Sequence, residues 1–272
     1  MMNIRNLTIN ASIVASSILI LFSEPAHAFS FTTHYTETHQ GSEASQGDIF
    51  LNAITLEDGK IIDDFALISS ANIISNDLYT GGNSGAASAE IGDLATTGIK
   101  EEQLTNEGAK AVMNNLNLNN IIDTEDAGHF ILDFNFEQAV DNIFIWERGM
   151  NSRLDIQALD ADGNLIGNKL ELSESRTWDN AGFQLDTKEI EGNQAVGSIG
   201  VNLADLGLDS GYISSLRVSS EGAAYNGPDF KILGSVAENA PQSIPEPSVL
   251  LGLGAIIAGI ATHRRRAAEA AA

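Results

Sequence analysis

Residues 129–136 spell HFILDFNF, and residues 142–147 follow with NIFIWE. In the first run, large apolar side chains recur at every second position, which places four of them on one face of a β-strand. These four are Phe130, Leu132, Phe134 and Phe136. The second run is apolar on both faces, as is typical of a strand between two layers. The two runs predict the centre of a β-rich core.

Shorter β-type runs lie on both sides of this centre. Residues 49–56 and 60–68 flank Asp58-Gly59, and residues 153–159 and 164–172 flank the segment 160–163, which also ends in Asp-Gly. Asp-Gly between such runs predicts a hairpin. Further strands are predicted near residues 177–183, 198–203, 212–219 and 229–236.

Two segments depart from the β pattern. Residues 100–116 carry apolar side chains at roughly helical spacing and predict one helix. Residues 75–98 are rich in Gly, Asn and Ser and predict a long loop, of the kind that often carries function. The fold class expected is therefore mainly β: an antiparallel two-sheet sandwich, jelly-roll-like, with one short helix.

The N-terminus carries the features of a secretory signal. Arg5 precedes an apolar run over residues 13–22, and Ala26-His27-Ala28 fits the small-x-small rule of signal peptidase. We expect residues 1–28 to form a signal helix that is cut after Ala28. Behind it, residues 29–47 are predicted to be a loosely held polar leader, residues 48–237 the sandwich ectodomain, and residues 238–244 a linker.

The C-terminus has three parts in a fixed order. Pro245-Glu246-Pro247 comes first, residues 249–262 carry no charge, and Arg264, Arg265 and Arg266 follow. Fourteen helical residues reach about 21 Å, which is short against a hydrocarbon core of about 30 Å. The arginines favour the cytoplasmic side, which leaves the rest of the chain outside. Residues 245–272 thus predict a C-terminal membrane helix.

This order of parts resembles the PEP-CTERM sorting signal that exosortases read in Gram-negative bacteria. The resemblance implies transient inner-membrane anchoring, cleavage near the Pro-Glu-Pro motif, and transfer to the cell surface or extracellular matrix. A plain membrane anchor is the alternative. The ectodomain is similar to cyanobacterial-type exosortase-dependent surface proteins in residues 141–149, 158–164 and 227–230, a likeness that assigns no activity to particular residues.

The composition limits the partners. The chain has 14 basic and 37 acidic residues, a net charge of −23, and no cysteine. Without the two targeting segments, 10 basic and 34 acidic residues remain, a formal charge of −24. Such a surface repels phosphate backbones, which argues against nucleic-acid binding, although it can attract divalent cations. The lack of cysteine excludes thiol chemistry and Cys-ligated zinc.

Two acidic clusters are candidates for calcium. Asp160, Asp162 and Asn164 imitate the start of a calcium loop, in which oxygen ligands recur at alternate positions. A plain hairpin turn is the alternative. The segment 123–126 contributes three further carboxylates before a core strand, and these could hold calcium across loops or form a solvated rim.

The aromatic side chains suggest a second kind of site. Trp178 and Tyr225 lie in polar surroundings and are candidates for stacking on sugar rings, whereas Trp146 lies in an apolar run and is expected in the core. The chain has no nucleophile elbow and no phosphate-binding loop, and it is not expected to be an enzyme. We expect a secreted surface or matrix protein with a structural or adhesive ectodomain. The alternative is a calcium-assisted carbohydrate-binding module acting on exopolysaccharide.

Overall fold

The computed structural model describes residues 28–238 and 240, except for 80–86, 92–98, 102, 174–177, 187–191 and 210. In chain order its strands are β1 (Phe31–Glu37), β2 (Ile49–Leu56), β3 (Ile61–Ile62), β4 (Phe65–Ala66), β5 (Ile68–Asn76), β6 (Ala87–Ile91), β7 (Ile99–Glu101), β8 (Asn120–Thr124), β9 (His129–Arg148), β10 (Leu154–Leu159), β11 (Leu165–Leu172), β12 (Asp179–Leu185), β13 (Gln194–Asn202), β14 (Ile213–Glu221) and β15 (Phe230–Val236). The helices are the 3-10 turn η1 (Gly41–Gln46) and α1 (Asn106–Met113).

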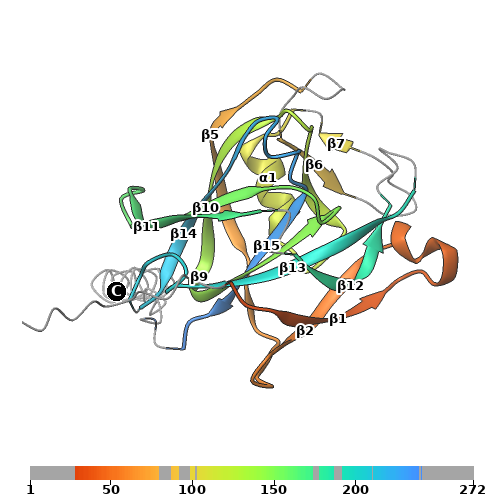
Figure 1. Ribbon diagram of the computed structural model, residues 1–272, viewed down its shortest axis with the longest axis horizontal. Helices are drawn as coiled ribbons and strands as arrows, with labels where there is room; N and C mark the ends of the chain where they lie inside the picture. Colours follow the sequence, from red (N-terminus) through yellow and green to blue (C-terminus); the bar gives the residue numbers. More distant parts are fainter. Residues whose placement is uncertain are drawn as a thin grey trace, which may run out of the picture.

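These strands form two antiparallel sheets (Figure 1). The small sheet has the order β1-β2-β3, and the large one follows β11-β10-β14-β9-β15-β8-β6-β7 with β4, β5, β12 and β13 attached. The mainly β, sandwich-like class predicted from the sequence is therefore confirmed.

The long strand β9 pairs with different strands in its two halves. In its first half, Phe134 lies opposite Leu216 of β14 and Ala71 of β5. In its second half, Ile145 lies opposite Ile199 of β13 and Ile232 of β15. β9 thus hydrogen-bonds to four other strands. Within the described residues, no other strand has four partners.

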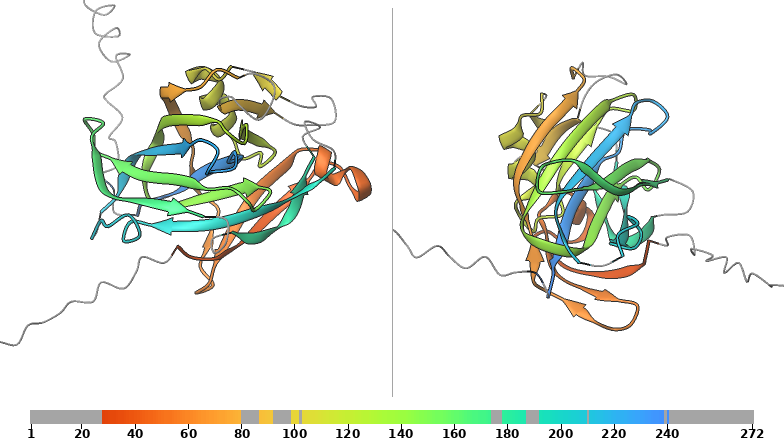
Figure 2. Two further views of the ribbon diagram at one scale, coloured as in Figure 1. Left: turned by 45° about the horizontal axis from the view of Figure 1, so that its top comes forward. Right: turned by 90° about the vertical axis from the view of Figure 1, so that its left-hand side faces the viewer.

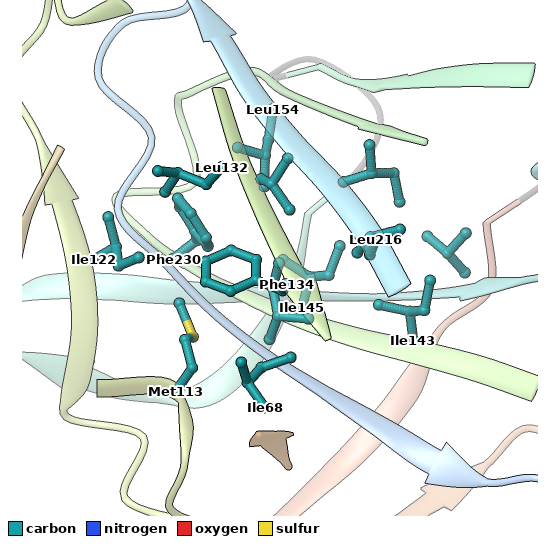
Figure 3. Packing of buried hydrophobic residues seen from close by; sticks show 14 of the residues in the cluster. Ile68, Met113, Ile122, Leu132, Phe134, Ile143, Ile145, Leu154, Leu216 and Phe230 are labelled. Atoms are coloured by element: carbon teal, nitrogen blue, oxygen red, sulfur yellow. The ribbon is translucent and has the colours of Figure 1, made fainter. Parts of the chain in front are cut away.

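The two faces of β9 bury different side chains. The alternating side chains of the first half are at most 6% exposed, which confirms the period of two. They pack with Ile143 and Ile145 in the main core, where Figure 3 shows Leu132 and Phe134 beside Phe230 of β15. Phe144 and Trp146 point the other way into a second core. The prediction that residues 142–147 lie between two layers is confirmed.

The second core is covered by the small sheet, and this corrects the prediction of a loose leader. The ring of Phe31 in β1 lies edge-on to Trp146 at 5.4 Å, and Trp146 Nε1 donates to Thr33 Oγ1 at 3.1 Å. Phe29 exchanges two backbone hydrogen bonds of 2.8 Å with Gly200. Threonine has a high β propensity, so a polar, Thr-rich segment forms a strand whose alternate side chains are buried. In Figure 2 (left) these red-to-orange strands lie along β12 and β13.

Two other predictions need adjustment. The helix exists but is shorter than residues 100–116: α1 begins after Thr105, whose Oγ1 accepts from Gly108 N at 3.0 Å, and residues 99–101 form β7 instead. The predicted loop at 75–98 contains β6, which pairs with β8; residues 80–86 and 92–98 lie outside the described part.

Both predicted hairpins form. The second run of the first hairpin continues from β3 into β4 and β5, which join the large sheet.

Lys231 is a fully buried lysine on β15. Its Nζ donates to the Val112 carbonyl at the end of α1 and to Asn115 Oδ1, 3.1 Å away. Burial lowers the pKa of Lys231 well below its ordinary value. Both acceptors have a second donor, because Asn115 Nδ2 bonds the Val112 carbonyl and Asn117 N bonds Asn115 Oδ1.

We expect Lys231→Met to keep or raise stability at neutral pH, by up to about 2 kcal/mol, since no buried acceptor loses its last donor. A lysine with a lowered pKa binds fewer protons in the folded state, so its contribution to stability grows as the pH rises toward 10.5. Urea unfolding between pH 7 and 10 should therefore show the variant losing stability relative to the wild type as the pH rises. Lys110→Met, on the half-exposed face of α1, should keep the wild-type pH profile; identical profiles for all three proteins would contradict the prediction.

Candidate functional site

Arg148, the last residue of β9, is the centre of a buried ionic cluster. Its Nη2 lies 2.8 Å from Asp123 Oδ1, and its Nη2 and Nε lie 2.8 and 3.0 Å from Asp229 Oδ2. Thr124 N and Arg148 N bond to Asp229 Oδ1 and O, each at 2.9 Å. The ends of β8 and β9 and the start of β15 therefore converge on one guanidinium group. All three charged side chains are at most 7% exposed overall.

A polar cavity of about 160 Å³ lies beside this cluster, and we call it the Arg148 pocket. Its walls carry carboxylates, carboxamides and one guanidinium group, without an aromatic or aliphatic side chain. They are formed by Asp123, Thr124, Glu125, Asp126, Arg148, Asn151, Gln194, Asn226, Gly227 and Asp229. Such a cavity suits a polar ligand rather than an apolar one.

The backbone around the pocket is held in uncommon conformations. The only non-glycine residues with positive φ in the described part of the chain are Met150 and Asn226, each at +57°. Ser152 Oγ bonds the Asn226 carbonyl at 2.8 Å, which ties the two loops together. A Cβ on Gly227, whose φ is +49°, would lie 2.2 Å from the Thr124 carbonyl. Residues in sparsely populated regions persist where their surroundings impose them, often near functional sites.

Glu147 lies next to Arg148 in sequence and is 0% exposed. Burial, and then the nearby Asp229 carboxylate, raise the pKa of Glu147 to about 8. The Ser152 hydroxyl and the Met150 N–H oppose the shift, but neither carboxyl oxygen makes a hydrogen bond of ordinary geometry. At neutral pH this side chain is therefore mainly a neutral acid.

The two aromatic residues predicted to stack on sugars are buried. Trp178 is 8% exposed and its Nε1 donates to the Ser152 carbonyl at 3.1 Å. Tyr225 is 5% exposed and its hydroxyl donates to Asp155 Oδ2 at 2.8 Å, while desolvation raises its pKa. Neither ring has an exposed face on which a sugar could stack, so this prediction was wrong. The residues next to them in the sequence are polar, but the rings themselves are buried. Trp146 is 1% exposed and in the core, as predicted.

Asp160, Asp162 and Asn164 close the turn between β10 and β11. Asp160 Oδ1 accepts from the N–H groups of Asp162 and Asn164, at 2.9 and 2.8 Å. Hydrogen bonds from the Asn164 backbone, then from its side chain, lower the pKa of Asp160. The hairpin is thereby confirmed, with Gly163 at a φ of +82°. Among the residues that the structure describes, no three His, Cys, Asp or Glu side chains are placed to share a metal ion, and calcium binding stays a prediction.

The acidic segment 123–126 is divided by the fold. Asp123 joins Arg148 in the buried cluster, Glu125 is half-buried, and Asp126 is exposed at the rim. Sequence analysis missed the roles of Arg148 and Asp229. The signal available was their position, since each is a charged residue directly at the end of a strongly apolar strand.

The targeting residues lie outside the described part of the chain. These are Ala26 of the predicted signal-peptidase site and Pro245, Glu246, Pro247, Arg264, Arg265 and Arg266 of the predicted sorting signal. Ala28 is described and packs against the main core. Within the described ranges, no helix has the length and apolar character needed to cross a membrane.

Comparison with models of known protein families and with curated protein sequences gave no match for this chain.

Proposed function

We propose that this chain is an exported surface or extracellular-matrix protein, sorted and cleaved by an exosortase. In this proposal the sandwich, with jelly-roll-like connections, is a non-enzymatic structural or adhesive ectodomain. Signal peptidase would act after Ala28 and the exosortase near the Pro-Glu-Pro motif. Transient anchoring in the inner membrane would precede release to the surface.

The order of parts in residues 245–272 carries the proposal: Pro-Glu-Pro, an uncharged apolar run and three arginines. The limits of the folded part agree with it. Phe29, the first residue after the predicted cleavage, already pairs with Gly200, and the last strand ends at Val236. Removing both targeting segments would thus leave every described strand intact.

Deleting residues 245–272 should move the protein from the cell surface into the medium or misroute it, because the segment read by the exosortase is gone. Immunoblots of surface, membrane and medium fractions measure this. Replacing Arg264, Arg265 and Arg266 by lysine should preserve sorting far better than replacing them by glutamine, since the positive charge holds the topology. Unchanged surface localisation of the deletion variant would sink the proposal.

The termini of the mature protein give a direct second test. Mass spectrometry of protein recovered from the surface should find Phe29 at the N-terminus and a C-terminus close to residues 245–247. An intact C-terminus at Ala272 on surface protein would favour the plain membrane anchor instead.

A further inference from the structure

The Arg148 pocket has the chemistry of a ligand site that the sorting signal does not explain. We propose that it binds one unit of an amino sugar, with the ammonium group among the carboxylates and the hydroxyl groups against the carboxamides. The proposal concerns the folded domain and does not depend on the route by which the protein leaves the cell.

Charge selects the ammonium group. Four carboxylates line the pocket against one guanidinium group, a formal charge of −3. Arg148 already lies within 3.0 Å of carboxylates on both sides, from Asp123 and Asp229. Its positive charge is therefore compensated, and the exposed Asp126 and half-buried Glu125 add a negative rim. A cation is attracted to such a cleft, whereas a uronate or phosphate is repelled.

The remaining walls select hydroxyl groups. Asn151, Gln194 and Asn226 carry carboxamides, which offer a donor and an acceptor each, as a sugar hydroxyl requires. The wall atoms that are buried without a hydrogen-bond partner include Thr124 Oγ1 and Gln194 Oε1. Thr124 is only 5% exposed, so its hydroxyl group is an unmet hydrogen-bonding group buried within a residue of the pocket wall.

Size and rigidity fit a single ring. The cavity of about 160 Å³ is below the range of drug-sized sites, so it suits one small polar molecule rather than a stretch of polymer within it. The ion pairs of Arg148 and the bond from Ser152 Oγ to the Asn226 carbonyl hold the walls in place without a ligand. A preformed site loses little free energy to ordering when it binds.

The test is a titration of ¹⁵N-labelled mature protein with D-glucosamine, followed by NMR of backbone amides. We expect saturable shifts at Asn151, Asn226 and Gly227 with a Kd on the order of 1 mM, as befits a ligand with few atoms. D-glucose, which lacks the ammonium group, should bind at least about tenfold more weakly. D-glucuronate should give no saturable shifts at these residues.

A matched pair of charge variants separates the pocket from the general acidity of the surface. Asp126→Asn removes an exposed carboxylate at the rim and should weaken glucosamine binding about threefold to fivefold. Asp162→Asn removes an exposed carboxylate in the β10–β11 turn and should leave the Kd unchanged. Unshifted spectra elsewhere confirm that both variants are folded.

Three outcomes would overturn the proposal. Equal binding of glucose and glucosamine would mean that the ammonium group is not recognised. Equal binding of methylammonium or Ca²⁺ at the same residues would reduce the pocket to a general cation site. No saturable shift by glucosamine far above the expected Kd would show that the pocket is structural only.

Discussion

Glu147→Gln should abolish a large pH dependence in the stability of this protein. The folded-state pKa of Glu147 is about 8, against an ordinary value of 4.5, because the side chain is wholly buried. Between these values the folded state binds more protons than the unfolded state, so stability is full below about pH 4.5 and is lost as the pH rises through 8. A shift of this size corresponds to a loss on the order of 5 kcal/mol. Glutamine keeps the shape and carries no titratable proton.

Urea unfolding at pH 5 and pH 9 measures this effect. The free energy of unfolding should fall much more in the wild type than in Glu147→Gln over that interval, and the two proteins should be similar at pH 5. Glu57→Gln, at an exposed position beside the first hairpin turn, should behave as the wild type does. The prediction fails if Glu147→Gln retains the wild-type loss between the two pH values.

Arg148→Met should destabilise the protein by about 3–5 kcal/mol. The substitution leaves the carboxylates of Asp123 and Asp229 buried without their shared guanidinium group, at positions where their side chains are only 3% and 10% exposed. The cost of a buried, uncompensated charge exceeds the packing that methionine restores. Because protonation relieves that cost, the deficit of the variant should be smaller at pH 5 than at pH 8.

Arg217→Met is the matched control for this experiment. Arg217 forms an equally regular pair with Asp133, with Nε and Oδ1 2.6 Å apart, but its side chain is 24% exposed. Water can solvate the remaining carboxylate there, so the loss should be about 1 kcal/mol. Chemical denaturation measures both losses. Equal losses of stability from the two substitutions would refute the claim that burial makes the Arg148 cluster more important for stability than the Arg217 pair.

Much of the fold could be predicted because it rests on local patterns. The alternation in residues 129–136, the two-sided apolar run that follows and the Asp-Gly turns each report on immediate neighbours in the chain. The strand β1 was missed because its exposed side chains are polar and its buried Thr33 counts as polar too, although its hydroxyl group meets Trp146. A local sequence pattern does not show that a polar side chain forms a hydrogen bond with a residue far away in the chain.

The candidate site was harder to predict, because its parts are distant in sequence. Arg148 is 25 residues from Asp123 and 81 residues from Asp229, and only the antiparallel pairing of β8, β9 and β15 brings them together. The prediction that Trp178 and Tyr225 stack on sugars failed because it relied on near neighbours in the sequence. Their surroundings in the sequence are polar, yet each ring turns inward and its polar atom finds an internal acceptor.

The shared strand β9 also constrains the order in which this protein can fold. Three of its four long neighbours, β13, β14 and β15, follow it in the chain. Pairings between residues far apart in sequence form slowly, because the intervening chain must be ordered first. Three of the four long strands that pair with β9 are therefore missing until the chain beyond it has been made, and a chain truncated before β15 should aggregate instead of folding in part.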